Sequence, residues 1–115
     1  MPRIINETRT TVVAEDVRVA DGIWSRFWGL MGRRSLAENA GLLLRPSSSI
    51  HTAFMRFPID VVFLSRSLRV VKVVPEMKLF RVTVAFGGAH SALELNAGAA
   101  AKAQVEKDDQ LALID

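Results

Sequence analysis

The chain has no cysteine and no tyrosine among its 115 residues. The absence of cysteine excludes a disulfide framework, a thiol nucleophile and a zinc site built on thiolates. Long apolar runs are also missing, because Asp60 and Lys72 interrupt the two longest, at 59–64 and 70–74. A helix that spans a bilayer needs roughly 20 apolar residues, so the sequence predicts no membrane span. Since the N-terminus shows no signal-peptide pattern, we expect a cytoplasmic protein.

The residues that are present favour a folded domain. Half of them are hydrophobic and 23% are charged, a balance that disfavours intrinsic disorder. A chain of this length has room for one hydrophobic core, so we predict a single domain over residues 1–115. The formal charge is +3 and the basic residues are spread along the chain. This distribution does not favour a nucleic-acid partner.

The spacing of apolar residues predicts one amphipathic helix near residues 21–33. Asp21 is a good N-cap and Gly32 a plausible C-terminal stop. The apolar face of this helix consists of Ile23, Trp24, Phe27, Trp28, Leu30 and Met31. A capping-box pattern at Ser35–Glu38 predicts a short helical turn, and Ala99–Val105 reads as a small second helix.

The rest of the chain is predicted to be mainly strands. The predicted strands are Val12–Val19, Leu42–Leu44, Ile50–Phe57, Ile59–Leu64, Leu68–Val74, Phe80–Phe86, Ser91–Leu95 and Leu111–Ile114. Pro75 is expected to end the strand before it. Because strands outnumber helices and do not alternate with them, we predict an α+β fold. The sheet is expected to be largely antiparallel, barrel-like or strongly curved, with strands near both ends of the chain joining it.

Three motifs resemble one known family. They are Trp28–Arg33, Ile50–Leu64 and Leu93–Gly98, in this order. Their sequences and spacing resemble the bacterial and archaeal family called domain of unknown function 192, over about residues 11–114. The resemblance implies a small sheet-rich α+β domain, and no activity is established for the family. Many members carry a leader sequence, and from the residues at its N-terminus we expect none in this chain.

Two positions depart from the family pattern. The middle motif usually continues aromatic-Met-Lys-Asn-Thr, whereas here Phe57 and Pro58 replace the Asn and Thr. Near the C-terminus the family often has Gly-Asp, and this chain has Asp108 and Asp109 instead. From that replacement we expect that a left-handed glycine is not required at this position.

Two carboxylates interrupt apolar strands. Asp60 lies in the run 59–64, where a buried carboxylate needs a donor, and Arg33 and Arg56 are the natural candidates. The favoured interpretation is a structural salt bridge or a turn cap, and the alternative is one wall of a polar pocket. Glu94 is predicted to share a strand face with Ala92, as a solvated or salt-bridged residue.

These residues leave three hypotheses open. The first is a non-catalytic binding or accessory domain, with a groove between the Trp24–Arg34 helix and the His51–Asp60 segment. This groove would recognise a small or anionic ligand or a peptide through Trp28, Arg33, His51, Arg56 and Asp60. The second is a small hydrolase or lyase that uses His51 as acid or base, with Asp60 or Glu94. The third is nucleic-acid binding through Arg26, Arg33 and Arg34.

No spacing of His, Asp and Glu matches a recognised metal motif, and no phosphate-binding glycine-rich loop is present. We therefore predict no metal and no cofactor. We expect a monomer or a weak dimer.

Overall fold

The computed structural model describes residues 2–20, 39–46, 49–51, 58–77, 82–85 and 87–115. These residues form three sheets and a short helix, α2 (Ala99–Lys102). The strands are β1 (Arg3–Asn6), β2 (Thr11–Ala14), β3 (Asp16–Ala20), β4 (Ala40–Leu44), β5 (Ser49–His51), β6 (Ile59–Leu64), β7 (Val70–Met77), β8 (Val82–Val84), β9 (Ser91–Asn96) and β10 (Leu111–Ile114). The predicted helix near 21–33 and the turn at 35–38 lie outside the described residues.

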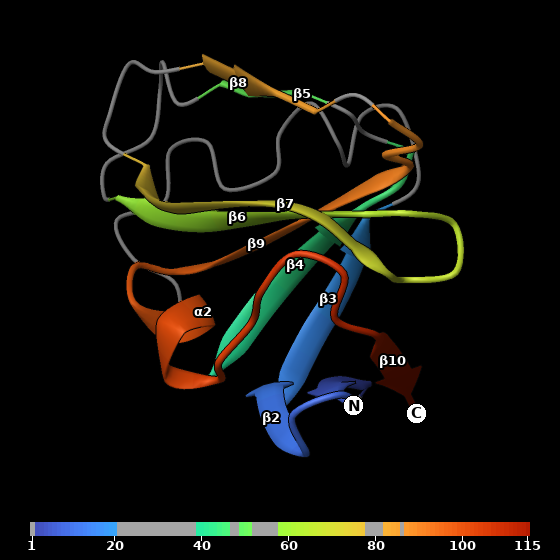
Figure 1. Cartoon of the computed structure of the whole chain (residues 1–115). Coiled ribbons are helices and arrows are strands. Elements are labelled where there is room, and N and C mark those ends of the chain that lie inside the picture. The colour runs from blue at the N-terminus through green and yellow to red at the C-terminus, as the bar shows by residue number, and fades with distance from the viewer. Residues whose placement is uncertain (1, 21–38, 47–48, 52–57, 78–81, 86) are drawn as a thin grey trace.

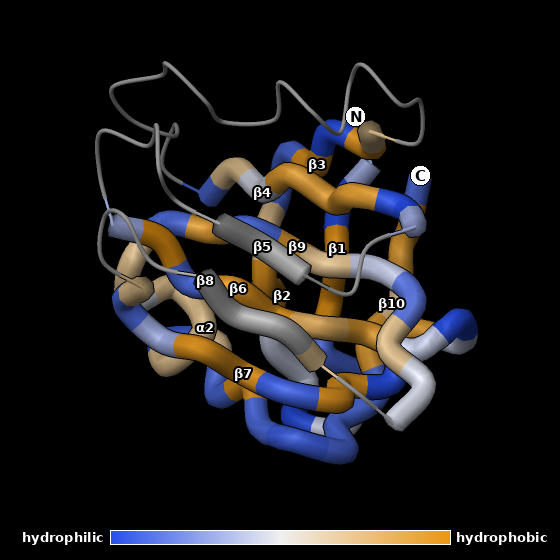
Figure 2. The backbone as a smooth tube through the Cα atoms, turned by 90° about the horizontal axis from the view of Figure 1, so that it is seen from above, coloured by the Kyte–Doolittle hydropathy of each residue, from blue (hydrophilic) through white to orange (hydrophobic). Residues whose placement is uncertain are grey.

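A five-stranded sheet with the order β3-β4-β9-β6-β7 is the central layer. The three-stranded sheet β10-β1-β2 and α2 lie on one side of it, and the β5–β8 pair lies on the other (Figure 1). Figure 2, turned to look from above, shows β5 and β8 lying over the five-stranded sheet. Strand β6 is buried along its whole length, because it has neighbours on both edges and packed side chains on both faces.

Each face of the central sheet carries its own hydrophobic core. The core toward the three-stranded sheet and α2 includes Ile4, Val17, Leu43, Val62, Leu64, Leu93, Leu95, Ala100 and Leu111. The core on the opposite face, toward the β5–β8 pair, includes Leu42, Leu44, Ile59, Val61, Phe63, Met77, Ala85 and Ala92. The side chains along β4, β6 and β9 alternate between the two cores, as the period of a strand requires. Phe63 is fully buried and contributes roughly 2–3 kcal/mol by its burial.

The α+β, sheet-rich and largely antiparallel fold predicted from the sequence is confirmed. The barrel-like form of that prediction is wrong for the described strands, because the five-stranded sheet is open and ends at β3 and β7. One pair, β3–β4, is parallel. A parallel pair needs a long crossover connection, and the chain between Ala20 and Asn39 supplies its length.

The predicted strand Val12–Val19 is two strands in different sheets. Strand β2 pairs with β1, and β3 pairs with β4. Between them the backbone N–H of Glu15 donates to the carbonyl of Asn39 (2.7 Å). Glu15 interrupts the alternation of apolar residues in this segment, and it marks the point where the chain passes from one sheet to the next.

Strand β7 does not end at Pro75 as predicted but continues to Met77. Proline is tolerated because β7 is an edge strand of the sheet, where a backbone N–H is not needed on the outer side. The β6–β7 register also shifts between Ile59 and Val61, and Glu76 has a positive φ of 49°. The irregularity accommodates Pro75 while both flanking segments stay paired.

The two ends of the chain join one sheet, although not the central one. Strand β1, which the sequence did not predict, pairs antiparallel with β10, and Arg3 lies opposite Ile114. Just before β10, Asp108 has φ 74°. The backbone at this position is left-handed, and an aspartate holds it. Glycine is therefore not required there, as expected from the sequence.

Candidate functional site

Asp60 is a fully buried carboxylate that accepts three backbone hydrogen bonds from the described residues. Its Oδ1 accepts from the N–H of Glu76 (2.7 Å), and its Oδ2 accepts from the N–H groups of Gly98 (3.1 Å) and Ala100 (2.8 Å). Arg33 and Arg56, the donors expected from the sequence, both lie outside the described residues. The donors observed here are main-chain groups. Several N–H donors can stabilise a buried carboxylate as a cation does.

These three bonds connect β6 to two turns that are distant in sequence. Helix α2 has Gly98 as its N-cap, with φ 93° and no side chain to cap it. Asp60 caps the first turn from the neighbouring strand instead, and it also holds the irregular segment around Glu76. The contacts agree with the turn-capping interpretation of Asp60, and they connect the family motif at 50–64 with the motif at 93–98.

Glu94 is the second buried carboxyl of the central sheet, with 5% of its surface exposed. It lies opposite Leu42 on β4 and Val61 on β6, and these neighbours belong to the core toward the β5–β8 pair. Within the part of the chain that the structure describes, its Oε2 has no hydrogen-bond partner. Glu94 is not solvated, contrary to one of the two expectations, because the second core covers the strand face on which it lies.

Burial raises the pKa of Glu94 from 4.5 to about 7. Removing a carboxylate from water without a compensating donor or cation disfavours its charged form. The carboxyl group is therefore present in both protonation states near neutral pH. It can donate a hydrogen bond to a ligand oxygen when protonated, and accept one when ionised.

Asp60 and Glu94 do not form a pair. Across β6 and β9, Asp60 lies opposite Leu95 and Val61 lies opposite Glu94. Adjacent positions point to opposite faces, so Asp60 points toward α2 and Glu94 points toward the β5–β8 pair. His51 is the last residue of β5, opposite Val82, and its backbone therefore belongs to the layer on the Glu94 side.

The remaining predicted contacts of the groove stay predictions. Trp28, Arg33 and Arg56 lie outside the described residues, as do the arginines of the proposed nucleic-acid surface. For His51 the structure describes only the backbone. Among the described residues, no group of three or more His, Asp and Glu side chains could hold a metal ion. No helix in that part of the chain is long and apolar enough to cross a membrane.

A third buried carboxylate, Asp109, was not among the candidate site residues predicted from the sequence. Its Oδ2 accepts from Asn6 Nδ2 (2.9 Å), from the N–H of Glu106 (3.0 Å) and from Arg9 Nε (3.3 Å). Arg9 also forms an ion pair with Glu106. Burial raises the pKa of Asp109, but the hydrogen bonds from Asn6, Glu106 and Arg9 outweigh it and leave the pKa below its ordinary value of 3.8. The cluster joins the turn between β1 and β2 to the turn that precedes β10.

The fold and its carboxylates define a class of protein: a small α+β domain with an open central sheet and a capping aspartate on one face. On the other face lies a buried glutamate whose Oε2 has no partner among the described residues. Within that class the chain belongs to the family called DUF192, described as an uncharacterized ACR, whose model matches residues 4–113. The resemblance drawn from the three sequence motifs is thereby confirmed.

Two relatives with similar sequences come from archaea. The chain is 33% identical to a UPF0127 protein of Thermococcus sibiricus over 116 residues, a match that covers 94% of this chain and 72% of that protein. It is 38% identical to a UPF0127 protein of Pyrococcus horikoshii over 73 residues, which covers 61% of this chain and 64% of the relative.

Two crystal structures share the fold. A protein of unknown function from Novosphingobium aromaticivorans matches with a TM-score of 0.82 and 20% identity, over 96% of this chain and 82% of that one. A candidate transcription regulator from Sinorhizobium meliloti matches with a TM-score of 0.83 and 22% identity, over 97% and 91%. Identities this low show a common fold and carry no function.

Proposed function

We propose that this chain is a small binding domain whose ligand contacts the Glu94 face of the central sheet. The observation that carries the proposal is the buried carboxyl of Glu94, whose Oε2 has no partner among the described residues. An unpaired polar group in an apolar core costs roughly 1–3 kcal/mol. A site that binds a ligand explains the cost, because the ligand supplies the missing hydrogen bond.

The surroundings of Glu94 fit a small ligand with an apolar part. Leu42, Val61 and Ala92 lie beside it on the same face, and the core that they join extends to Ala85, the residue after β8. Apolar walls with one or two polar groups are typical of small-molecule sites. The groove expected from the sequence would place His51 on the opposite wall, since β5 belongs to that layer.

The preferred ligand is an anion such as a carboxylate. Protonated Glu94 can donate to an oxygen of the anion, and Arg33 and Arg56, which the sequence assigns to the same groove, would supply positive charge. Binding that requires protonated Glu94 takes up a proton above pH about 7, the pKa to which burial raises this group. Affinity should therefore fall as the pH rises above 7.

NMR titration with acetate, succinate and inorganic phosphate tests this proposal. We expect saturable shifts of the amides of Leu42, Val61 and Glu94, and weaker binding at pH 8 than at pH 6 because Glu94 is then mostly ionised. Glu94→Gln, which keeps a donor of similar size, should bind at both pH values. Glu94→Leu should lose roughly tenfold in affinity, the equivalent of one hydrogen bond. The absence of a saturable shift with all three anions would overturn the proposal.

The hydrolase or lyase alternative is supported by the same pKa. A carboxyl that titrates near 7 suits general acid–base catalysis at neutral pH. The Gln variant separates the two functions, since it can bind a ligand but cannot transfer a proton. If wild type hydrolyses p-nitrophenyl acetate with a rate inflection near pH 7 and Glu94→Gln does not, while anion binding persists, catalysis is the better description.

A further inference from the structure

The outer edge of β7 has backbone groups that point away from the sheet. The N–H of Ser65 donates to the carbonyl of Arg69, the residue before β7, so Ser65 directs its N–H toward β7. Counting back along β6 by alternation, Phe63 and Val61 also direct their backbone groups toward β7, and Val62 directs its own toward β9. Val73 lies opposite Val62. The N–H and C=O of Val73 therefore face outward.

One end of this edge is already covered by the chain itself. Val70 donates its N–H to the carbonyl of Asp109, and its carbonyl accepts from the N–H of Asp108, both at 2.8 Å. Beyond Val70, no strand of the described part of the chain pairs with the outer side of β7. The open edge thus begins where the turn at 105–109 leaves it and ends at Pro75, which has no N–H to offer.

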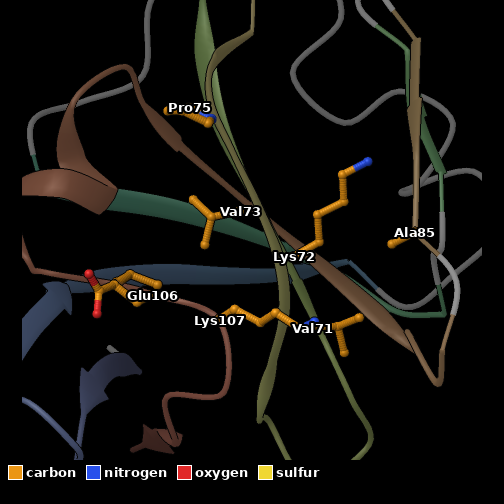
Figure 3. Close-up of a pocket in the computed structure, with 8 residues that line it drawn as sticks. Val71, Lys72, Val73, Pro75, Ala85, Glu106 and Lys107 are labelled. Carbon is orange, nitrogen blue, oxygen red and sulfur yellow. The ribbon is translucent and has the colours of Figure 1, made fainter.

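A groove with a volume of about 760 Å³ follows this edge and has a wall on each side of the sheet (Figure 3). Ala85 forms the wall on one face, and residues 105–107 form the wall on the other. Strand β7 contributes side chains on both faces of the central sheet. Val71 packs with the core on the face toward the β5–β8 pair, and Val73 packs with the opposite core. Both valines are half-buried.

We propose that this groove binds an extended peptide segment of a partner protein as an added strand on β7. In an added strand the main chain pairs with the edge while alternate side chains point to opposite faces. The groove lies along the sheet edge and has apolar residues on both faces of the sheet. It can therefore accept the alternating side chains of an added strand. The segment would be short, because covered Val70 and Pro75 bound the open edge.

The charges of the groove favour an acidic segment. Lys72 and Lys107 both line it, and Figure 3 shows Lys72 extending toward the side of Ala85. Among the described residues that line it, the one acidic residue, Glu106, is paired with Arg9. A second copy of the chain is disfavoured as the occupant, because antiparallel pairing of two β7 strands would place the Lys72 residues of both copies on one face.

Titration with a short acetylated peptide in which valine and glutamate alternate tests this inference. We expect saturable NMR shifts of the amides of 71–75 and 105–107. The same peptide with N-methylated backbone amides should not bind, because it cannot pair with a strand. In the protein, Val73→Pro should weaken binding roughly tenfold through loss of the outward N–H donor. Val73→Thr, which keeps that N–H and the branched shape, is the matched control.

Charge gives a second criterion. Lys107→Glu should weaken the binding of the glutamate peptide and strengthen that of a valine–lysine peptide. Equal binding of the N-methylated peptide, or no saturable binding of the glutamate peptide, would overturn the inference. So would concentration-dependent dimerisation that shifts the same amides without peptide, because a second copy would then be the occupant. If Val73→Pro fails to fold, the N-methylated peptide still decides the question.

Discussion

Asp60 and Glu94 lie in adjacent register positions of paired strands, and their side chains leave the central sheet on opposite faces. Both are buried. Asp60 accepts three backbone N–H groups, whereas Glu94 has an oxygen without a partner among the described residues. The same residue class therefore has two physical roles in one sheet. The carboxylate of Asp60 stabilises the fold, and the carboxyl of Glu94 is the candidate for binding.

Replacing Asp60 should destabilise the protein strongly. Asp60→Ala removes the acceptors of three backbone N–H groups in a buried environment, and we expect a loss of about 3–5 kcal/mol in the free energy of unfolding. Asp60→Asn keeps one acceptor oxygen, but its side-chain NH2 group would face backbone N–H donors. This variant should therefore also lose stability. Urea denaturation measures both. A loss below about 1 kcal/mol for Asp60→Ala would contradict the capping role.

Replacing Glu94 should change the pH dependence of stability. Because the pKa of Glu94 is raised in the folded state to about 7 from 4.5, the folded protein binds more protons than the unfolded chain between these values. Stability is then highest below pH 4.5, falls as the pH rises toward 7 and stays low above it. The loss amounts to about 3 kcal/mol.

Glu94→Gln carries no titrating group and should not show this decline. At pH 8 it should be more stable than wild type by up to about 3 kcal/mol, as measured by urea denaturation across the pH range. Glu7→Gln, which alters an exposed carboxylate outside both cores, is the control. A wild-type curve parallel to that of Glu94→Gln would show that Glu94 does not titrate as described.

Asp109 should have the opposite effect at acidic pH. Its pKa is lowered in the folded state, so the ionised form stabilises the fold. That contribution is fully present above the ordinary pKa and is lost as the pH falls through the lowered one. Asp109→Asn should therefore be less stable than wild type at neutral pH, and the difference should shrink in acid. Acid unfolding followed by circular dichroism checks this, and a difference independent of pH would count against it.

Asp108 offers a stabilising change. It holds a left-handed backbone conformation with φ 74°, which strains a residue that has a side chain. Asp108→Gly should relieve this strain and raise the melting temperature, with a gain of about 0.5–1 kcal/mol offset in part by the entropy of glycine. Gly98→Ala, at φ 93°, imposes the reverse change and should lower the melting temperature. If both variants shift it in the same direction, backbone strain is not the cause.

Much of the fold follows from local patterns. The bounds of β6 and β10 were predicted correctly, since a continuous apolar run and a short alternating segment identify a strand without further context. The α+β class followed from the order of the elements. Patterns of this kind succeed because side-chain direction alternates along a strand whatever lies on each side.

The remaining features depend on contacts that a linear pattern does not contain. The face of Glu94 was predicted, but its burial was not, because burial depends on the second core that covers that face. Pro75 continues an edge strand, and only the strand order shows that β7 is at an edge. The donors of Asp60 come from Glu76, Gly98 and Ala100, up to 40 positions away. None of them has a side chain that donates in these bonds, so no sequence signal identifies them.

The pairing of β1 with β10 sets the order in which the molecule can be completed during synthesis. Arg3 lies opposite Ile114, so β1 can pair with β10 only after residues 111–114 have left the ribosome. Until then Ile4, which is fully buried in the finished protein, has no β10 beside it. A nascent chain that stalls before Leu111 would therefore expose the unpaired edge of β1 to chaperones and proteases.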